Sequence, residues 1–169
     1  MRVSSLSCPS KDAQLGDGQG MGAPRDPKVT SRIMAAVRDR DTEPERLLRC
    51  ALFRLGLRFR LHAKRLPGRP DIVFSGKRVA VFVDGDFWHG GGWKERGFAT
   101  FEEQFSSHKS AFWIRKIRGN VERDRRANIE LRKMGWKVVR FWESAVRRSP
   151  ERCALKVIQA LERQSRTKR

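Results

Sequence analysis

Two short apolar runs lie within residues 70–89, PDIVFSGKRVAVFVDGDFWH. The runs are 72–74 and 79–83, and the turn-forming sequence SGK follows the first of them, which predicts a hairpin of two buried strands. Cross-strand neighbours in a hairpin lie roughly 5 Å apart. The pattern therefore predicts that Asp71, at the start of the first strand, lies opposite residues 82–84 at the end of the second.

Helical signals flank this hairpin on both sides. Upstream, Thr42 and Glu45 have the spacing of a capping box, and apolar residues at helical spacing follow as far as Leu55. Strands flanked by helices predict an α/β fold with mixed layers, in one domain. The same kinds of signal predict a short helix from residue 30 or 31 to 37, helices over 109–116 and 121–134, a strand over 136–142 and a last amphipathic helix from 150.

The chain is strongly basic, with 38 Lys and Arg against 19 Asp and Glu in 169 residues, a formal net charge of +19. A surplus of this size predicts a polyanionic partner such as nucleic acid. No apolar run approaches the roughly 18–20 residues that cross a bilayer, so a membrane-spanning protein is not expected. The three cysteines are scattered, and residues 1–20 lack the apolar stretch of a secretory signal, so a cytoplasmic location is expected.

Composition divides the chain into three segments. Residues 1–28 are rich in Ser, Gly, Pro and Asp and are expected to form a disordered tail. The periodic apolar patterns lie within residues 29–163, which are expected to form the globular domain. Residues 164–169 are expected to form a basic C-terminal tail.

Acidic residues gather at the predicted ends of the two hairpin strands. Asp71 is expected beside Asp84 and Asp86, and grouped carboxylates in so basic a chain indicate a site for a hard divalent cation such as Mg²⁺. The alternative for Asp84-Gly85-Asp86 is a simple turn, because Asp and Gly favour turns. His89 is either a general base beside a metal-bound water or a hydrogen-bonded structural histidine.

Two further features also have two interpretations each. The aromatic pair Phe87-Trp88 fits either packing in the core or insertion between DNA bases. Asp124 lies in the charged run ERDRR at 122–126, where a surface ion pair is the simpler interpretation.

Four motifs, in this order and spacing, make the chain recognisable: LPGRPD at 66–71, VDGDFWH at 83–89, NVERDRR at 120–126, and GW at 135–136 with WE at 142–143. Over residues 29–146 the chain resembles the Vsr-type very-short-patch-repair DNA mismatch endonucleases, a branch of the restriction-endonuclease-like nucleases. The resemblance implies a mixed central sheet flanked by helices in a single nuclease domain. It also implies an enzyme that uses Mg²⁺ to nick one strand of double-stranded DNA 5′ to the T of a T·G mismatch, leaving a 5′-phosphate. Mismatch-repair factors are the further expected partners, and a monomer is expected.

The resemblance assigns roles residue by residue. Asp71 matches the metal-binding aspartate, and Val83 matches the residue whose backbone carbonyl completes the metal site, with Asp84 as a further candidate ligand. His89 matches the general base, and Asp124 matches an acidic residue that supports catalysis. Glu45 matches a helix glutamate near the site, with the capping box as its alternative.

The resemblance also assigns contacts with DNA. Phe87 and Trp88 match aromatic residues that wedge beside the mismatch, and Met34 matches an apolar side chain that enters from the other groove. The remaining DNA-binding candidates are basic residues whose charges would neutralise phosphates: Arg69, Arg123 and Arg126.

The chain departs from the family pattern in two ways. Family members typically bind a structural zinc through Cys and His, whereas the matching positions hold Asp86, Gly91, Trp93 and Ser144, so no structural zinc is expected. Asp84 stands where the family often has a second histidine. These departures keep two alternatives open: a structure- or sequence-specific nuclease of the same superfamily without T·G specificity, and a non-catalytic DNA-binding module.

Overall fold

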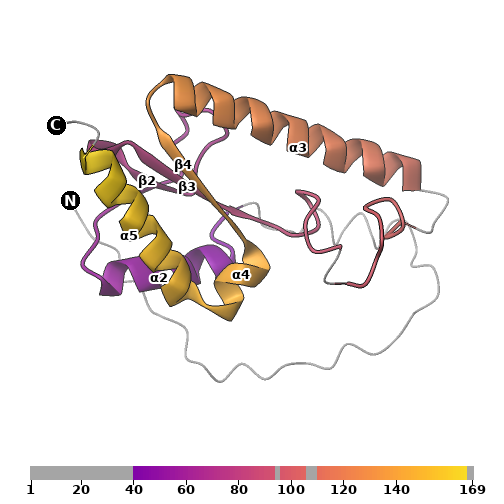
Figure 1. Ribbon diagram of the computed structural model, residues 1–169, viewed down its shortest axis with the longest axis horizontal. Coiled ribbons are helices and arrows are strands. Elements are labelled where there is room, and N and C mark those ends of the chain that lie inside the picture. Colours follow the sequence, from indigo (N-terminus) through magenta and orange to yellow (C-terminus); the bar gives the residue numbers. More distant parts are fainter. Residues whose placement is uncertain (1–39, 94–95, 106–109, 167–169) are drawn as a thin grey trace.

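The structure is a computed structural model that describes residues 40–93, 96–105 and 110–166 (Figure 1). Three sequence-based expectations lie outside the described residues: the tail over 1–28, the short helix ending at 37, and Met34 within it. The basic tail expected over 164–169 begins inside a helix, because the last helix of the chain ends at Arg166.

The centre of the fold is a mixed four-stranded sheet in the order β1-β2-β3-β4. Neighbouring strands are antiparallel between β1 and β2 and between β2 and β3, and parallel between β3 and β4. A single α/β domain with a mixed sheet flanked by helices is the restriction-endonuclease-like architecture that the resemblance implies. The strands are β1 (Arg60–Leu61), β2 (Ile72–Phe74), β3 (Val79–Asp84) and β4 (Lys137–Trp142).

The predicted hairpin is confirmed, with β2 and β3 as its strands. Ile72 pairs with Val81, and the backbone N–H of Asp71 donates to the carbonyl of Val81 at 3.1 Å, so the pairing extends to Asp71. The backbone N–H of Val83 in turn donates to Asp71 Oδ2 at 2.8 Å. The structure therefore places Asp71 opposite residues 82–84, as its sequence position predicts.

Helices cover both faces of the sheet (Figure 1). On one face lie α2 (Glu43–Arg54), α4 (Glu143–Arg148) and α5 (Pro150–Arg166), and on the other lies α3 (Ser110–Lys133). Alternate residues of β3 serve the two faces: Val79 and Val81 pack in the larger core with α2 and α5, and Ala80 and Phe82 pack with Leu131 of α3. None of the described helices is long and apolar enough to span a membrane.

The prediction of two helices over 109–116 and 121–134 is wrong, because α3 runs without a break from Ser110 to Lys133. Gly119, between the two predicted segments, lowers helix propensity but faces open space. Ile117, before the glycine, and Leu131, after it, are fully buried. Their packing keeps the helix continuous across Gly119. This continuity matters because α3 carries Asp124 to within 3.0 Å of Arg140 on β4.

Candidate active site

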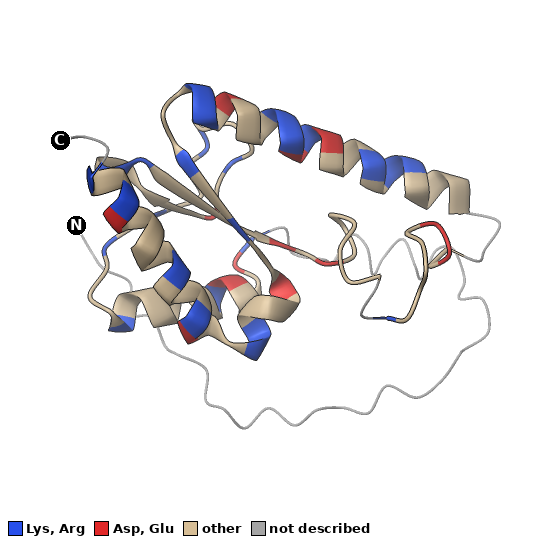
Figure 2. Cartoon of the chain, in the orientation of Figure 1, with Lys and Arg blue, Asp and Glu red and all other residues tan. Residues whose placement is uncertain are grey.

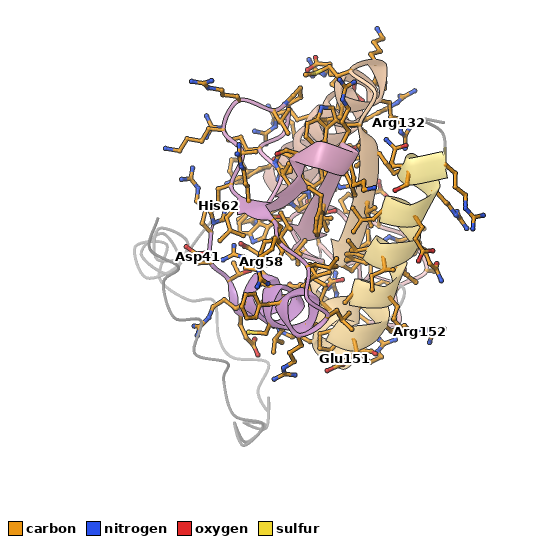
Figure 3. The ribbon with its side chains drawn as sticks, turned by 90° about the vertical axis from the view of Figure 1, so that its left-hand side faces the viewer. Asp41, Arg58, His62, Arg132, Glu151 and Arg152 are labelled. Atoms are coloured by element: carbon orange, nitrogen blue, oxygen red, sulfur yellow. The ribbon has the colours of Figure 1, made fainter. Side chains whose placement is uncertain are left out.

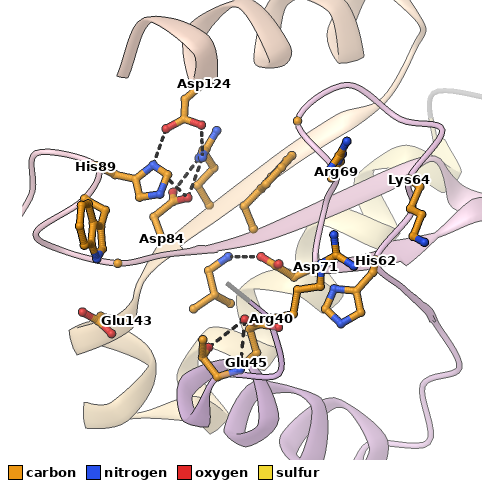
Figure 4. Close-up of a pocket in the computed structure, with 17 residues that line it drawn as sticks. Arg40, Glu45, His62, Lys64, Arg69, Asp71, Asp84, His89, Asp124 and Glu143 are labelled. Carbon is orange, nitrogen blue, oxygen red and sulfur yellow. Dashed lines mark hydrogen bonds and ion pairs between the residues drawn. The ribbon is translucent and has the colours of Figure 1, made fainter. Parts of the chain in front are cut away.

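A cavity of about 510 Å³ opens where β3 ends and the first turn of α2 begins (Figure 4). Acidic and basic side chains of the hairpin, α2, α3 and β4 line this cavity. The acidic and histidine side chains of this lining are Glu45, His62, Asp71, Asp84, His89, Asp124 and Glu143, and the basic ones are Arg40, Lys64, Arg69 and Arg140. The structure thus brings Asp71, Asp84, His89, Asp124 and Glu45 to one site.

Asp71 is a largely buried carboxylate held at the start of β2. One oxygen accepts the Val83 hydrogen bond, and among the described residues the other oxygen accepts none. Burial raises the pKa of Asp71 from 3.8 to about 6; the Val83 hydrogen bond opposes this rise, and the charges of Glu45 and Asp84 add to it. Burial therefore disfavours the ionised form of Asp71. A carboxylate oxygen of this kind fits a hard divalent cation.

His89 and Asp124 form a second, directly bonded pair on the cavity wall. The histidine Nδ1 lies 2.5 Å from Asp124 Oδ2. Because a carboxylate only accepts, Nδ1 carries the proton, which leaves Nε2 as the basic nitrogen. Burial lowers the pKa of His89, but the Asp124 hydrogen bond and the charges of Asp84 and Asp124 outweigh it and the pKa is raised. An imidazole paired in this way with a carboxylate is suited to accept a proton.

Asp124 is held in its ionised form at this pair. Burial raises the pKa of its carboxyl group, yet the hydrogen bond from His89 and the charge of Arg140 bring the pKa below its ordinary value. The interpretation of Asp124 as a member of a surface ion pair is wrong about its partners. Asp124 pairs with His89 and Arg140 on the cavity wall and not with its neighbours in the sequence.

Asp84 is buried and already paired. Its two oxygens accept from Arg140, Oδ2 from Nε at 2.7 Å and Oδ1 from Nη2 at 2.6 Å. Asp84 is the last residue of β3, and the turn begins at Asp86. The interpretation of Asp84-Gly85-Asp86 as a simple turn is therefore correct for Asp86 only. Arg140 had no signal in the sequence that linked it to this site.

Glu45 combines both of its proposed interpretations. Its carboxylate makes the capping box by accepting from the backbone N–H of Thr42 at 3.4 Å, and it also accepts from the threonine hydroxyl at 2.8 Å. The same side chain is only 3% exposed and lines the cavity beside Asp71, whose pKa it helps to raise. Glu45 can therefore cap α2 and line the cavity at the same time, because the first turn of α2 faces the cavity.

A neighbouring group of potential ligands, Asp41, Glu45 and His62, was not anticipated from the sequence. Figure 3 labels two of its members, Asp41 and His62. Arg49 occupies its centre, with one guanidinium nitrogen bonded to Asp41 and the other 2.6 Å from Glu45 and 3.2 Å from His62. This cluster already contains its positive charge. A lone histidine such as His62 carries no pattern by which sequence reasoning could have found it.

Several known proteins are similar in sequence to this chain. A model of the family "DNA mismatch endonuclease Vsr" matches residues 25–95. The chain is 38% identical over 135 residues to the type II nicking enzyme V.NmeDIP of Neisseria meningitidis serogroup C, covering 80% of this chain and 87% of that protein. It is also 38% identical over 122 residues to the DNA mismatch endonuclease Vsr of Escherichia coli K12, covering 72% and 74%. The chain belongs to the Vsr family. A third relative, the type II nicking enzyme V.HpaIIP of Haemophilus parainfluenzae, is 38% identical over 129 residues, covering 76% of this chain and 87% of that protein. Membership makes this chain an endonuclease of the Vsr type.

An aromatic cluster borders the site of this Vsr-family chain. The ring centroids of Phe87 and Trp88 are 5.2 Å apart, and Trp113 of α3 lies 5.7 and 5.9 Å from them. Lys116 lies over the Trp88 ring at 5.3 Å, and the adjacent Phe112 is 55% exposed. Phe87 and Trp88 are half-buried, so they pack together while keeping part of their rings accessible. Sequence reasoning missed Trp113 because it lies in a separate helix.

A basic groove adjoins the cavity between the 67–69 loop and α3. Arg69, Arg123 and Arg126 line it together with His89 and Asp124. Gly68 permits this close approach, because it has a φ of +71° and an added Cβ would lie 2.9 Å from Ala127 Cβ. Figure 2 shows that Lys and Arg positions are distributed along α3. Five of the six predicted DNA-binding residues are thus adjacent to the site, and the sixth, Met34, lies outside the described residues.

Three of the four positions that were expected to match zinc ligands of the family, Asp86, Gly91 and Ser144, are connected here by direct hydrogen bonds. Asp86 Oδ1 accepts from the Ser144 hydroxyl at 2.9 Å, and Asp86 Oδ2 accepts from the Ser144 backbone N–H at 3.1 Å. The backbone N–H of Gly91 donates to the Asp86 carbonyl at 2.7 Å. A Cβ at residue 91 would lie 2.8 Å from the Trp142 ring, so only glycine packs there. These contacts tie the segment after β3 to the start of α4.

Replacing Asp86 by alanine is expected to release this segment. The variant loses two hydrogen bonds from Ser144, which costs about 1–3 kcal/mol of unfolding free energy, and amide exchange over 86–93 accelerates. Hydrogen–deuterium exchange measured by mass spectrometry reports the change, with Glu103→Ala on the neighbouring loop as a control.

Metal analysis of the wild type should find no stoichiometric zinc; one zinc per chain would contradict the proposed arrangement.

Proposed function

We propose that this chain is a Mg²⁺-dependent endonuclease that nicks one strand of double-stranded DNA next to a mismatch, 5′ to the T of T·G, and leaves a 5′-phosphate. The observation that carries the proposal is the convergence of Asp71 and the His89–Asp124 pair on one cavity that continues into a basic groove. The names of the relatives, which include a DNA mismatch endonuclease and nicking enzymes, support it.

The metal site of the proposal consists of the Asp71 carboxylate and the backbone carbonyl of Val83. Asp71 fits this role because, among the described residues, one of its oxygens accepts no hydrogen bond, and because its burial favours a bound cation that would compensate its charge. Asp84 is left out of the proposed ligand set, because Arg140 binds both of its oxygens. When bound, Mg²⁺ supplies polarisation of the scissile phosphate and compensation of its developing charge.

The proton is handled by the second pair. Within the described part of the chain, the ion pairs of His89 all involve Nδ1, so Nε2 takes the proton from the attacking water while Nδ1 keeps its bond to Asp124. The Asp124 charge stabilises the imidazolium that forms. Glu45 fixes the start of α2 beside Asp71 and maintains the negative field there.

DNA is bound by charge and opened by aromatic side chains in this proposal. Arg69, Arg123 and Arg126 neutralise phosphates along the groove, which makes the affinity fall steeply with salt. Phe87 and Trp88, supported by Trp113, enter the base stack at the site. Unstacking costs least where pairing is already weak, so the aromatic cluster favours mismatched steps.

The experiment is a nicking assay with purified protein, Mg²⁺ and end-labelled duplexes that are matched or carry each single mismatch. We expect nicking of the T·G duplex alone, on the T strand, with a ligatable 5′-phosphate. Nicking of matched or branched duplexes instead would favour a nuclease of the same superfamily without T·G specificity, as the residues Asp84, Asp86 and Ser144 leave open. Binding of duplexes without cleavage would show a non-catalytic module.

A further inference from the structure

A charged network runs along one wall of the cavity in the order Asp84, Arg140, Asp124, His89 (Figure 4). Its members come from β3, β4, α3 and the loop after β3, so it joins four parts of the fold. Arg140 is its centre and its only permanent cation. We refer to these four residues as the Arg140 network.

The guanidinium of Arg140 is fixed from several directions. Nε and Nη2 bind the two oxygens of Asp84, and Nη2 also lies 3.0 Å from Asp124 Oδ1. Nη1 donates to Asn128 Oδ1 at 3.1 Å, and the plane lies over the Phe82 ring at 4.5 Å. A planar fork with this many fixed contacts holds its partners in defined orientations, which the single point charge of a lysine does not.

Two carboxylates lie within reach of His89 Nδ1. Asp124 Oδ2 is 2.5 Å away and Asp84 Oδ1 is 3.8 Å away. Arg140 binds both oxygens of Asp84 but only Oδ1 of Asp124, so Asp124 Oδ2 is the one carboxylate oxygen of the network that remains for the histidine.

We propose that Arg140 is a positioning residue of the nicking reaction: it holds Asp84 away from His89 and orients Asp124, so that His89 bonds through Nδ1 and presents Nε2 to the cavity. The proposal rests on the proposed function in so far as His89 is the base. Arg140 itself touches neither water nor phosphate in this role. Arg140 thus has two separable effects, on the second carboxylate near His89 and on the orientation of Asp124. Asp84→Asn removes the second carboxylate, so any effect of Arg140 that remains in its presence is the orientation of Asp124.

A purely structural ion pair between Asp84 and Arg140 is the competing explanation. Buried pairs of this kind contribute little net stability, and removal of one partner is costly because the other charge is left buried. A single substitution of Arg140 therefore confounds folding with positioning. A purely structural pair between Asp84 and Arg140 does not require the contact between Arg140 and Asp124. The experiment therefore tests that contact.

The test compares three variants with the wild type. Asp84→Asn/Arg140→Gln replaces the buried pair by two neutral amides, Arg140→Lys keeps the charge but not the fork, and Arg152→Gln removes an exposed arginine on α5 as a matched control (Figure 3). Thermal unfolding establishes that each variant folds. Nicking of the duplex cut by the wild type gives kcat and KM separately, and long-range ¹H–¹⁵N spectra report the tautomer of His89, one of three histidines in the chain.

We expect the double variant to fold and to lose about 10–100-fold in kcat with KM within about threefold of wild type, since a displaced base costs rate rather than binding. Its His89 signals should show a mixture of tautomers in place of the Nδ1–H form. Arg140→Lys should recover only part of the rate, and Arg152→Gln should match the wild type.

The proposal is overturned if the folded double variant keeps the wild-type kcat and His89 tautomer. It is equally overturned if KM rises as much as kcat falls while the His89 signals stay unchanged, because Arg140 would then act by binding DNA. Should the wild type nick no duplex at all, the proposed function fails on its own, and the His89 spectra still decide whether Arg140 sets the histidine's partner.

Discussion

Replacing Asp71 by asparagine is expected to abolish nicking and, at the same time, to stabilise the metal-free fold. Nicking should fall ~10³-fold or more, because the proposed metal loses its charged ligand while DNA binding by the groove arginines is retained. The asparagine side-chain oxygen still accepts the hydrogen bond that Val83 donates to Asp71. The substitution is close to isosteric, so the lost activity reports charge rather than packing.

The gain in stability follows from the raised pKa of Asp71. A pKa that rises from 3.8 to about 6 on folding means that the fold favours the protonated form, by about 3 kcal/mol. This contribution is complete below pH 3.8 and is lost as the pH rises through about 6, so the metal-free wild type lacks it at pH 7.5. Asparagine never ionises, and the midpoint of thermal unfolding should rise by roughly 5–10 °C in the presence of chelator.

Thermal unfolding at pH 4 and pH 7.5 measures this effect, with Glu162→Gln as a matched control on the exposed side of α5. The wild type and the Asp71 variant should differ at pH 7.5 and converge at pH 4. Added Mg²⁺ should stabilise the wild type and not the variant, because only the wild type binds the ion at this place. A variant that nicks at the wild-type rate, or a wild type indifferent to Mg²⁺, would refute the assignment of Asp71 to the metal.

The hairpin and its acidic corner were predictable because their signals are local. Two apolar runs around a tight turn fix the register of β2 and β3, and the register alone puts Asp71 opposite the end of β3. The helix from Glu43 and the glycine that ends α3 were likewise predictable from caps. In each case, the residues that determine the structure are neighbours in the sequence.

Where the sequence misled, distant residues decide. The break expected near Gly119 is overridden by the burial of Ile117 and Leu131 against the rest of the fold. Asp84 was grouped with Asp71 because both are acids at strand ends, yet its partner is Arg140, 56 positions later in the chain. Only the parallel pairing of β3 with β4 brings that arginine beside it. Six-residue α4, which carries Ser144, gave too short a periodic pattern to be predicted.

Replacing His89 by glutamine is the second substitution with a large expected effect, and the chain offers its own control. Nicking should fall about 10²–10⁴-fold, the usual contribution of a positioned base, with DNA affinity little changed. His62 lines the same cavity but lies against Asp41 and Arg49. His62→Gln removes an imidazole from the same cavity and should leave the rate within a few-fold, which separates base catalysis from a general effect on the cavity.

The His89→Gln and His62→Gln variants should also differ in the pH dependence of nicking. The pKa of His89 is raised, since its bond to Asp124 and the nearby carboxylate charges outweigh the opposing effect of burial. Only the neutral imidazole accepts a proton, so the rate should fall as the pH drops through a value above the ordinary histidine pKa of about 6.5. Single-turnover rates from pH 5.5 to 9 on a T·G duplex with saturating Mg²⁺ measure this limb, which His89→Gln should lack and His62→Gln should keep. An unchanged limb in the His89 variant would assign the proton transfer to another group.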